Sequence, residues 1–361
     1  MEKYITGEEA VAGIKSGDRI FVQGSASTPL YLLRQLEKRA DELEDVEVMC
    51  LSVLGDIAIN KPEYEKSFHF NTLFVSGPIR KNVNGLNGDY IPVFLSEIHQ
   101  LFERQHLPVD TALVHVSPPD KHGFCSLGVS VDIARAAVKY SRRVVAQVNP
   151  QMPRTHGDGL IHISQIDAMV EVDEPLPEVD YSKAVTDTER RIGYNLASLI
   201  DDGATIQAGI GTIPDAVFDC LTDHKNLGVH TEMFSDGVVR LMKSGAVNNR
   251  LKHKHRHKTA TSFAIGTRTL YDFVDDNPEF SFLNASYVNN GYVIRSNPNV
   301  VAVNSAIEID LTGQVCVDSI GVKQFSGVGG QMDFIRGAAL SENGKPIIAM
   351  GSMTGKGISK K

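Results

Sequence analysis

Apolar residues in the first third of the chain are arranged as short buried runs that alternate with helix-like spacing. The apolar runs predict strands at residues 20–22, 46–51, 72–75 and 112–116, and the helical spacing predicts helices at residues 8–16, 30–39 and 96–105. Thr6 and Glu9 are placed to form a capping box at the start of the first helix. Alternation of this kind favours an α/β domain with a largely parallel sheet.

The pattern stops at residues 173–180 and then begins again. This segment reads D-E-P-L-P-E-V-D, and its two prolines and four acids suit neither the interior of a helix nor that of a strand. A strongly amphipathic helix is expected directly after it, at residues 188–199. We therefore predict two domains, residues 1–180 and 181–361, which the length of the chain allows.

The second half resembles the first in two places, in the same order. Residues 17–29 (G-D-R-I-F-V-Q-G-S-A-S-T-P) match residues 203–214 (G-A-T-I-Q-A-G-I-G-T-I-P) with one gap, and residues 114–123 match residues 303–313. An internal duplication is the favoured interpretation. It predicts two similar, doubly wound, mainly parallel sheets that face each other, with the ligand at the carboxyl ends of strands between the domains.

Composition and charge exclude several classes of protein. The net charge of −8 argues against nucleic acid as the main partner. No apolar run is long enough to cross a bilayer and the N-terminus does not resemble a signal peptide, so we expect a cytoplasmic protein without a membrane partner. The four cysteines are far apart, and three histidines at residues 253–257 alternate with Lys and Arg, so no metal site is expected.

Two glycine-rich loops are candidates for ligand binding. Residues 209–214 (G-I-G-T-I-P) lie between a predicted strand and a predicted helix, where backbone N–H groups can meet an anion. A tight turn without a ligand fits that segment equally well, because it lacks the complete dinucleotide or P-loop pattern. Residues 326–331 (S-G-V-G-G-Q) can present N–H groups to an oxyanion, or can form a flexible surface loop.

Glu232 is the candidate nucleophile. It is the single carboxylate in residues 227–233, which read L-G-V-H-T-E-M, and an Asp-Gly turn follows it. Glutamates in loops more often serve solubility, so this interpretation depends on the surrounding motifs. His230 would share a strand face with Glu232, and we expect it to have a supporting or core role. Ser117 and His122 belong to no G-x-S-x-G elbow.

Taken together, four stretches resemble the acetyl-CoA hydrolase/transferase family. They read G-I-G-T-I-P, L-G-V-H-T-E-M-F-S-D-G, N-S-A-I-E-I-D-L-T-G-Q-V and S-G-V-G-G-Q-M-D-F-I-R-G-A. In the first half, residues 90–98 (Y-I-P-V-F-L-S-E-I) and 115–124 (H-V-S-P-P-D-K-H-G-F) extend the likeness over nearly the whole chain. Within the family, the sequence is most similar to the 4-hydroxybutyrate and butyrate:acetate CoA-transferases.

The resemblance implies a two-domain α/β fold of the class I CoA-transferase type and a homodimer. CoA or acyl-CoA would be a substrate, with no permanently bound cofactor, and a small carboxylate such as acetate would be the second substrate. Glu232 would carry a glutamyl-CoA thioester. The residues that match the family's CoA-binding positions are Gly209, Ile210, Gly211, Thr212, Ile213, Ile307 and Gly330.

Three functions stay open on the sequence. The first is transfer of CoA from a 4-hydroxybutyryl-, butyryl- or acetyl-CoA to a carboxylate; the second is hydrolysis of acetyl-CoA by the same glutamate. The third is a non-catalytic CoA-binding regulatory protein. CoA is expected between the halves with its thiol at Glu232, and Ser27 and Thr28 are weaker candidates for the acyl pocket. Members of the family continue beyond Lys361, so the second domain is expected to be truncated.

Overall fold

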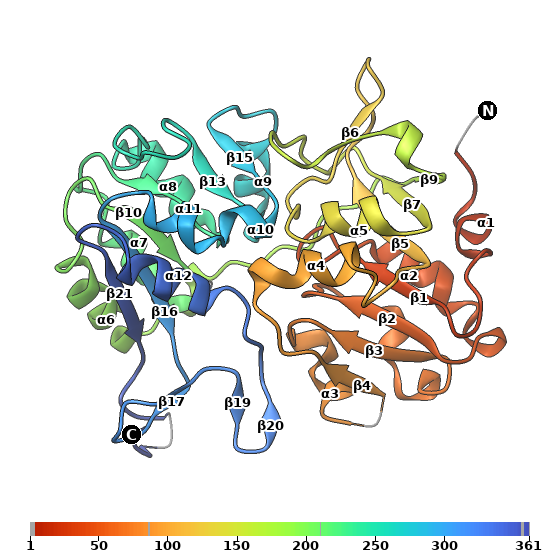
Figure 1. Ribbon diagram of the computed structural model, residues 1–361, viewed down its shortest axis with the longest axis horizontal. Helices are drawn as coiled ribbons and strands as arrows, with labels where there is room; N and C mark the ends of the chain where they lie inside the picture. The colour runs from red at the N-terminus through yellow and green to blue at the C-terminus, as the bar shows by residue number, and fades with distance from the viewer. Residues whose placement is uncertain (1–3, 86, 210, 355–356, 361) are drawn as a thin grey trace.

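The computed structural model describes residues 4–85, 87–209, 211–354 and 357–360, and it contains two main sheets (Figure 1). Both sheets are entirely parallel within the described residues, with strand orders β4-β3-β2-β1-β5-β7-β9 and β11-β10-β16-β21. The first comprises β1 (Arg19–Val22), β2 (Val46–Cys50), β3 (Phe68–Thr72), β4 (Gly88–Tyr90), β5 (Thr111–Val116), β7 (Arg143–Val148) and β9 (Ala168–Glu171). The second comprises β10 (Thr205–Ala208), β11 (Gly228–Val229), β16 (Val300–Ser305) and β21 (Lys345–Ala349). The predicted α/β class is confirmed.

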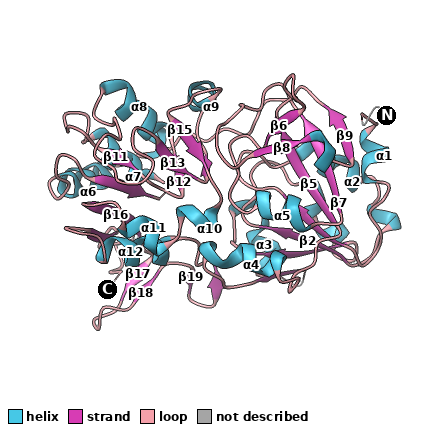
Figure 2. Cartoon of the chain, turned by 45° about the horizontal axis from the view of Figure 1, so that its top comes forward, coloured by secondary structure: helices cyan, strands magenta, loops and turns pink. Residues whose placement is uncertain are grey.

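Helices cover both faces of the first sheet. Side chains alternate along β1, so Ile20 packs in one apolar core and Phe21 in another. The core around Ile20 includes residues of α1 (Gly7–Val11) and α2 (Leu30–Glu37). The core around Phe21 includes residues of α4 (Ile98–Glu103) and α5 (Ala134–Tyr140). Burial of both faces is typical of parallel sheets. Figure 2 shows helices lying over strands in both halves of the molecule.

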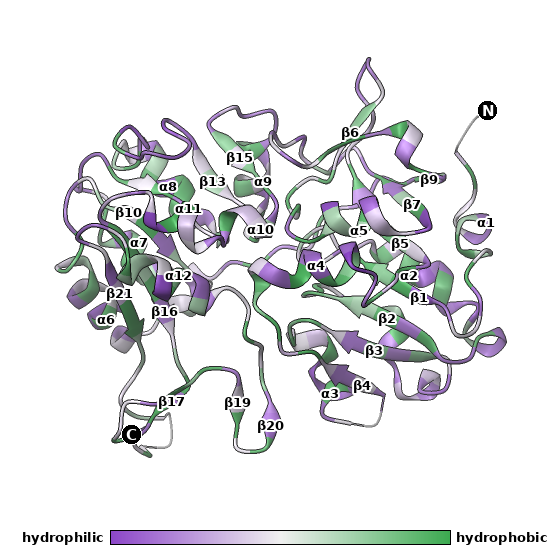
Figure 3. Cartoon of the chain, viewed as in Figure 1, coloured by the Kyte–Doolittle hydropathy of each residue, from purple (hydrophilic) through white to green (hydrophobic). Residues whose placement is uncertain are grey.

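The second sheet is built in the same way. Ala302 of β16 packs with side chains of α11 (Gly291–Arg295) and α12 (Gln331–Ala339), while its neighbour Val303 joins the core around α7 (Thr212–Asp219). That core also contains Phe21, so one apolar core runs through both halves. Figure 3 shows hydrophobic residues along several strands, such as β2 and β21, and hydrophilic residues on many of the outer loops and helices.

The topology agrees with an internal repeat. β1 lies between β2 and β5, and β10 lies between β11 and β16. Each of these central strands leads through a small-residue loop into a helix, α2 in the first half and α7 in the second. These are the two segments whose sequences resemble one another.

Several boundaries differ from the sequence prediction. The strand expected at residues 72–75 lies four residues earlier, at β3, because Phe68 and Phe70 supply the buried positions of the alternation. The first helix has the predicted capping box but ends at Val11. Residues 173–180 have no helix or strand, and the domain division after residue 180 stays a prediction. Within the described residues, no helix is long and apolar enough to cross a bilayer.

Candidate active site

A cavity of about 190 Å³ lies where segments of both halves meet, at the carboxyl ends of β10 and β16. This is the edge at which parallel α/β sheets bind ligands. Most of its walls are apolar, and they come from Leu51, Phe74 and Leu95 of the first half and from Met233, Phe263 and Ile265 of the second. The polar lining includes Glu232, Gln207 and Asn304, together with the glycine loop at residues 326–331.

Glu232 lies between β11 and β12 (Met233–Phe234) and is partly exposed to this cavity. Its carbonyl oxygen accepts hydrogen bonds from the backbone N–H groups of Ser262 and Phe263, at 2.8 and 3.1 Å. Its side-chain Oε2 accepts one from Nδ2 of Asn289, at 2.8 Å. Both the backbone and one carboxylate oxygen are therefore held in place.

Burial raises the pKa of Glu232 to about 7. The hydrogen bond from Asn289 lowers this pKa, whereas the negative charges of Asp333 and Asp132 raise it further. A carboxylate in this state is poorly hydrated and close to half ionised at neutral pH. That combination suits a nucleophile, which must lose little solvation energy in order to react.

Gly330 allows the close approach of Glu232 and Asn289. A Cβ atom at this position would lie 1.7 Å from Oε2 of Glu232 and 2.1 Å from Nδ2 of Asn289. Gly330 is also the N-cap residue of α12, and it lines the cavity together with Gln331. The first N–H groups of a helix have no partner within it. The start of α12 therefore presents hydrogen-bond donors beside the carboxylate of Glu232.

Sequence reasoning did not identify three residues that surround Glu232. Besides its bond to Glu232, Asn289 places Nδ2 at 3.4 Å from Oδ2 of Asp333. Asp333 in turn accepts hydrogen bonds from the backbone N–H and the hydroxyl of Ser96, at 3.3 and 2.9 Å. Asp333 and Ser96 both belong to stretches that resemble the family, but nothing in the sequence alone brings Asn289 to them.

His230 has the predicted core role. It is buried, and Nε2 donates a hydrogen bond to the carbonyl of Val288 at 2.8 Å. Burial lowers the pKa of His230 to about 3, so the ring is neutral. Because Val288 precedes Asn289, this bond ties the strand before Glu232 to the helix that supplies its hydrogen-bond donor.

The residues predicted to contact CoA fall into two groups. Gly209 and Gly330 line the cavity with Glu232. Gly211, Thr212 and Ile213 form the start of α7, and Ile307 precedes the β17–β18 hairpin (Glu308–Ile309, Val315–Cys316); these four lie outside the described cavity lining. Ile210 lies outside the described residues.

Ser27 and Thr28 do not line this cavity, and their predicted place in the acyl pocket stays a prediction. Both are buried, and the hydroxyl of Thr28 donates a hydrogen bond to the carbonyl of Ser25 and accepts one from the N–H of Leu54. The segment with Ser52 covers this loop, since the N–H of Ser25 bonds to the carbonyl of Ser52. The loop therefore supports a cavity wall and does not form one.

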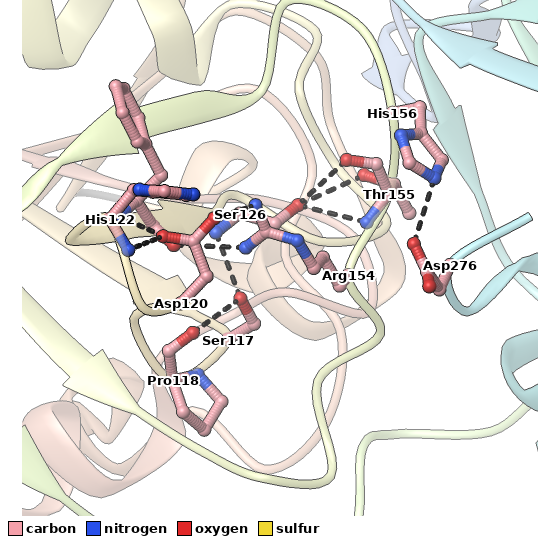
Figure 4. A network of polar contacts seen from close by, with 10 residues as sticks. Ser117, Pro118, Asp120, His122, Ser126, Arg154, Thr155, His156 and Asp276 are labelled. Atoms are coloured by element: carbon pink, nitrogen blue, oxygen red, sulfur yellow. Dashed lines mark hydrogen bonds and ion pairs between the residues drawn. The ribbon is translucent and has the colours of Figure 1, made fainter. Parts of the chain in front are cut away.

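Ser117 and His122 belong to a separate polar network (Figure 4). The hydroxyl of Ser117 accepts from the N–H of Ser126 at 2.9 Å, and the backbone N–H of His122 donates to Asp120 at 2.8 Å. Asp120 also forms an ion pair with Arg154 at 2.7 Å. These bonds fix a turn, and none of the five residues lines the cavity.

Comparison with known proteins places the chain in a family. Models of the acetyl-CoA hydrolase/transferase N-terminal and C-terminal domains match residues 1–180 and 266–360. The 4-hydroxybutyrate coenzyme A transferase of Clostridium kluyveri is 48% identical over 356 residues, covering 99% of this chain and 83% of the relative. The succinyl-CoA:acetate/propanoyl-CoA:succinate CoA transferase of Fasciola hepatica is 46% identical over 359 residues, covering 98% and 74%.

Solved structures give the same result. RipA from Yersinia pestis superposes with a TM-score of 0.92 at 33% identity, covering 99% of this chain and 84% of that one. A 4-hydroxybutyrate CoA-transferase from Porphyromonas gingivalis superposes with a TM-score of 0.85 at 37% identity, with the same coverage. The chain therefore belongs to the acetyl-CoA hydrolase/transferase family and is an enzyme of the CoA-transferase type.

Proposed function

We propose that this enzyme moves CoA between a short-chain acyl-CoA and a small carboxylate such as acetate, through a glutamyl-CoA thioester on Glu232. The observation that carries the proposal is the state of Glu232: a poorly hydrated carboxylate in an apolar cavity, with Oε2 held by Asn289. The names of the relatives support 4-hydroxybutyryl-, butyryl- and acetyl-CoA as the acyl donors to test.

The reaction begins when Glu232 attacks the thioester carbonyl of the acyl-CoA. The C–S bond breaks, which gives a mixed anhydride and CoA thiolate. The thiolate then attacks the glutamyl carbonyl, so that the first carboxylate leaves and a glutamyl-CoA thioester remains. An incoming carboxylate reverses these two steps and departs as the new acyl-CoA.

Each step builds negative charge on a carbonyl oxygen. The amide of Asn289 and the first N–H groups of α12 are the donors that we assign to this charge. One such donor contributes about 3 kcal/mol to the transition state in comparable sites. The rest of CoA would bind along Gly209, residues 211–213 and Ile307, and this remote binding energy can be used at the reacting carbon.

The proposal is tested by incubating butyryl-CoA or acetyl-CoA with labelled acetate and following both label exchange and free thiol. Exchange that needs the carboxylate and releases no net thiol supports a transferase. Thiol release without the carboxylate identifies a hydrolase. If neither exchange nor thiol release is observed, CoA binding without catalysis is the function that remains.

The role of Glu232 is tested separately. We expect Glu232→Gln to fold, to bind CoA and to lose at least about 10³-fold in turnover, since an amide cannot form the anhydride. Borohydride added after acyl-CoA should modify Glu232, because the glutamyl thioester is reducible. More than a tenth of the wild-type activity in Glu232→Gln, or a modification mapped to Glu97 or Glu308, would remove Glu232 from this role.

We also propose a homodimer, on the strength of the family membership, and the division into domains at residues 180 and 181. Light scattering coupled to gel filtration tests the homodimer, by measuring the mass of the particle in solution. Expression of residues 1–180 alone tests the domain division, because a separate domain should unfold in one cooperative thermal transition.

A further inference from the structure

A second carboxylate lies beside the nucleophile and reaches it through one amide group. Nδ2 of Asn289 is 2.8 Å from Oε2 of Glu232 and 3.4 Å from Oδ2 of Asp333. Asn289 is completely buried, so water does not compete for this nitrogen. The two N–H bonds of the amide therefore have two carboxylate oxygens as their partners.

The two ends of an amide differ, because one donates hydrogen bonds and the other accepts them. Oδ1 of Asn289 is buried and has no hydrogen-bond partner among the described residues. The protein thus leaves the accepting end unpaired while both donated bonds are made at the other end. An unpaired buried oxygen is destabilising, so the contacts at the nitrogen must offset its cost. With Glu232 alone, a single bond would hold the amide in this orientation; Asp333 adds the second.

Asp333 is itself held from the other half of the chain. It lies in the first turn of α12, and Ser96 of η5 (Leu95–Glu97) donates to both of its carboxylate oxygens. Beside this contact, the N–H of Leu95 donates to the carbonyl of Gly329 at 3.0 Å. The position of Asp333 therefore depends on how the first half docks against the glycine loop and α12.

We propose that Asp333 is a positioning residue, which holds the Asn289 amide with its nitrogen toward Glu232, and that Ser96 couples this arrangement to the docking of the two halves. The inference rests on the proposed role of Glu232 as the nucleophile. In this arrangement Asp333 touches neither Glu232 nor the reacting atoms through its own hydrogen bonds; it acts through Asn289.

Asp333 has two opposite effects on Glu232. Its negative charge raises the pKa of Glu232, whereas the donor that it orients lowers that pKa. The other charged group that raises the pKa of Glu232 is Asp132, and the negative charge of Glu97 raises the pKa of Asp333. Nearby His230 is neutral. A variant that removes the charge of Asp333 but keeps an acceptor oxygen separates the two effects.

The experiment compares Asp333→Ala with Asp333→Asn in the full chain. In Asp333→Ala the amide loses its second acceptor, and we expect kcat to fall about tenfold to a hundredfold with KM for acyl-CoA within about twofold. Asp333→Asn keeps an oxygen that can accept from Asn289, so it should recover most of kcat. Glu342→Gln, which removes an exposed charge just beyond α12, is the matched control and should match the wild type.

A second readout does not need activity. In protein labelled with ¹³C-glutamate, the carboxyl signal that is missing from Glu232→Gln reports the pKa of Glu232. Asp333→Asn removes the charge and keeps the acceptor, so we expect it to move this titration to lower pH. Asp333→Ala removes the acceptor as well, so its Glu232 titration should lie at higher pH than that of Asp333→Asn, and Asn289→Ala should move the titration above that of the wild type. Unchanged kcat in Asp333→Ala, or the same Glu232 titration in Asp333→Ala and Asp333→Asn, would overturn the positioning role. If the wild type exchanges no CoA but the titrations shift as stated, the proposed reaction fails and the positioning role stands.

Discussion

At the scale of single residues, the site depends on the poorly hydrated carboxylate of Glu232 and on Gly330, whose missing side chain leaves room for Glu232 and Asn289. Glu232 is bonded to Asn289 at a normal hydrogen-bond distance, in a cavity with mostly apolar walls. Gly330 leaves the space that both groups occupy. Each feature gives a prediction that a single substitution can check.

Gly330→Ala should inactivate the enzyme without unfolding it. The added methyl group would lie 1.7 Å from Oε2 of Glu232, so the carboxylate and the Asn289 amide must move apart. A displacement of about an ångström in a reacting group can cost a hundredfold in rate. We expect kcat to fall at least that far while the thermal midpoint changes by a few degrees. Gly77→Ala reports the effect of adding a methyl group outside the cavity, since Gly77 is exposed and a Cβ atom there meets nothing within 4 Å.

The pH dependence follows from the raised pKa of Glu232. The reactive form is the ionised one, so kcat/KM for acyl-CoA should rise with pH, pass its midpoint near pH 7 and level off above it. Asn289→Ala removes the donor that stabilises the ionised form and should shift the midpoint to higher pH. A midpoint near 4.5, the ordinary value for a glutamate, would mean that the carboxylate is hydrated in solution.

At the scale of elements, the segment from β20 (Lys323–Gln324) to the start of α12 forms one wall of the cavity and is fastened to the first half. Asn84 exchanges two hydrogen bonds with the backbone of Gln324, at 2.8 and 2.9 Å. Arg80 donates to the carbonyl of Phe325 at 2.8 Å. The glycine loop thus gains its position from contacts outside its own sequence.

Tyr90→Phe tests this attachment. The N–H of Val328 donates to the hydroxyl of Tyr90 at 2.7 Å, and Phe would leave that N–H without its partner. We expect a loss of about 1 kcal/mol in the free energy of unfolding and a several-fold rise in KM for acyl-CoA, because the loop is less well ordered before the substrate binds. Tyr194→Phe, at an exposed position on α6 (Asp187–Ala197), is the control; equal effects in both variants would contradict the assigned role.

At the scale of the whole molecule, two parallel sheets place the carboxyl ends of their strands around one cavity, and a shared apolar core joins the halves. This arrangement keeps Glu232 away from water, which helps its reaction but costs stability when it is ionised. The free energy of unfolding should therefore be lower when Glu232 is ionised than when it is protonated.

Glu232→Gln should stabilise the protein at alkaline pH. The pKa of Glu232 is about 7 in the folded protein and near 4.5 when unfolded, so the folded state holds a proton that the unfolded state has lost. Stability of the wild type then falls between pH 4.5 and 7, by roughly 3 kcal/mol. Gln removes this dependence. Urea unfolding measures the free energy of unfolding of both proteins at pH 5 and pH 8. The difference in favour of Glu232→Gln should be larger at pH 8 than at pH 5 by a similar amount. An equal difference at both pH values would contradict the titration of a buried Glu232.

The sequence alone determined the class of fold, the repeat of strand, small-residue loop and helix, and the candidate nucleophile. These follow from local patterns: apolar periodicity, turn residues at residues 209–214 and a single carboxylate at Glu232. They are encoded within a few residues of one another, so no long-range contact is needed to find them. The family resemblance added the candidate CoA positions, whose contacts stay predictions.

Only the tertiary structure decided which residues surround the nucleophile. Ser96, Asn289 and Asp333 are far apart in the sequence, and their contacts arise because the first half docks onto α12 and the end of α10 (Ala285–Val288). Ser27 and Thr28, by contrast, are buried among contacts within the first half, including the carbonyl of Leu127 and the N–H of Leu54. The energy of burying a polar group depends on what lies opposite it in space, and a local sequence pattern does not contain that information.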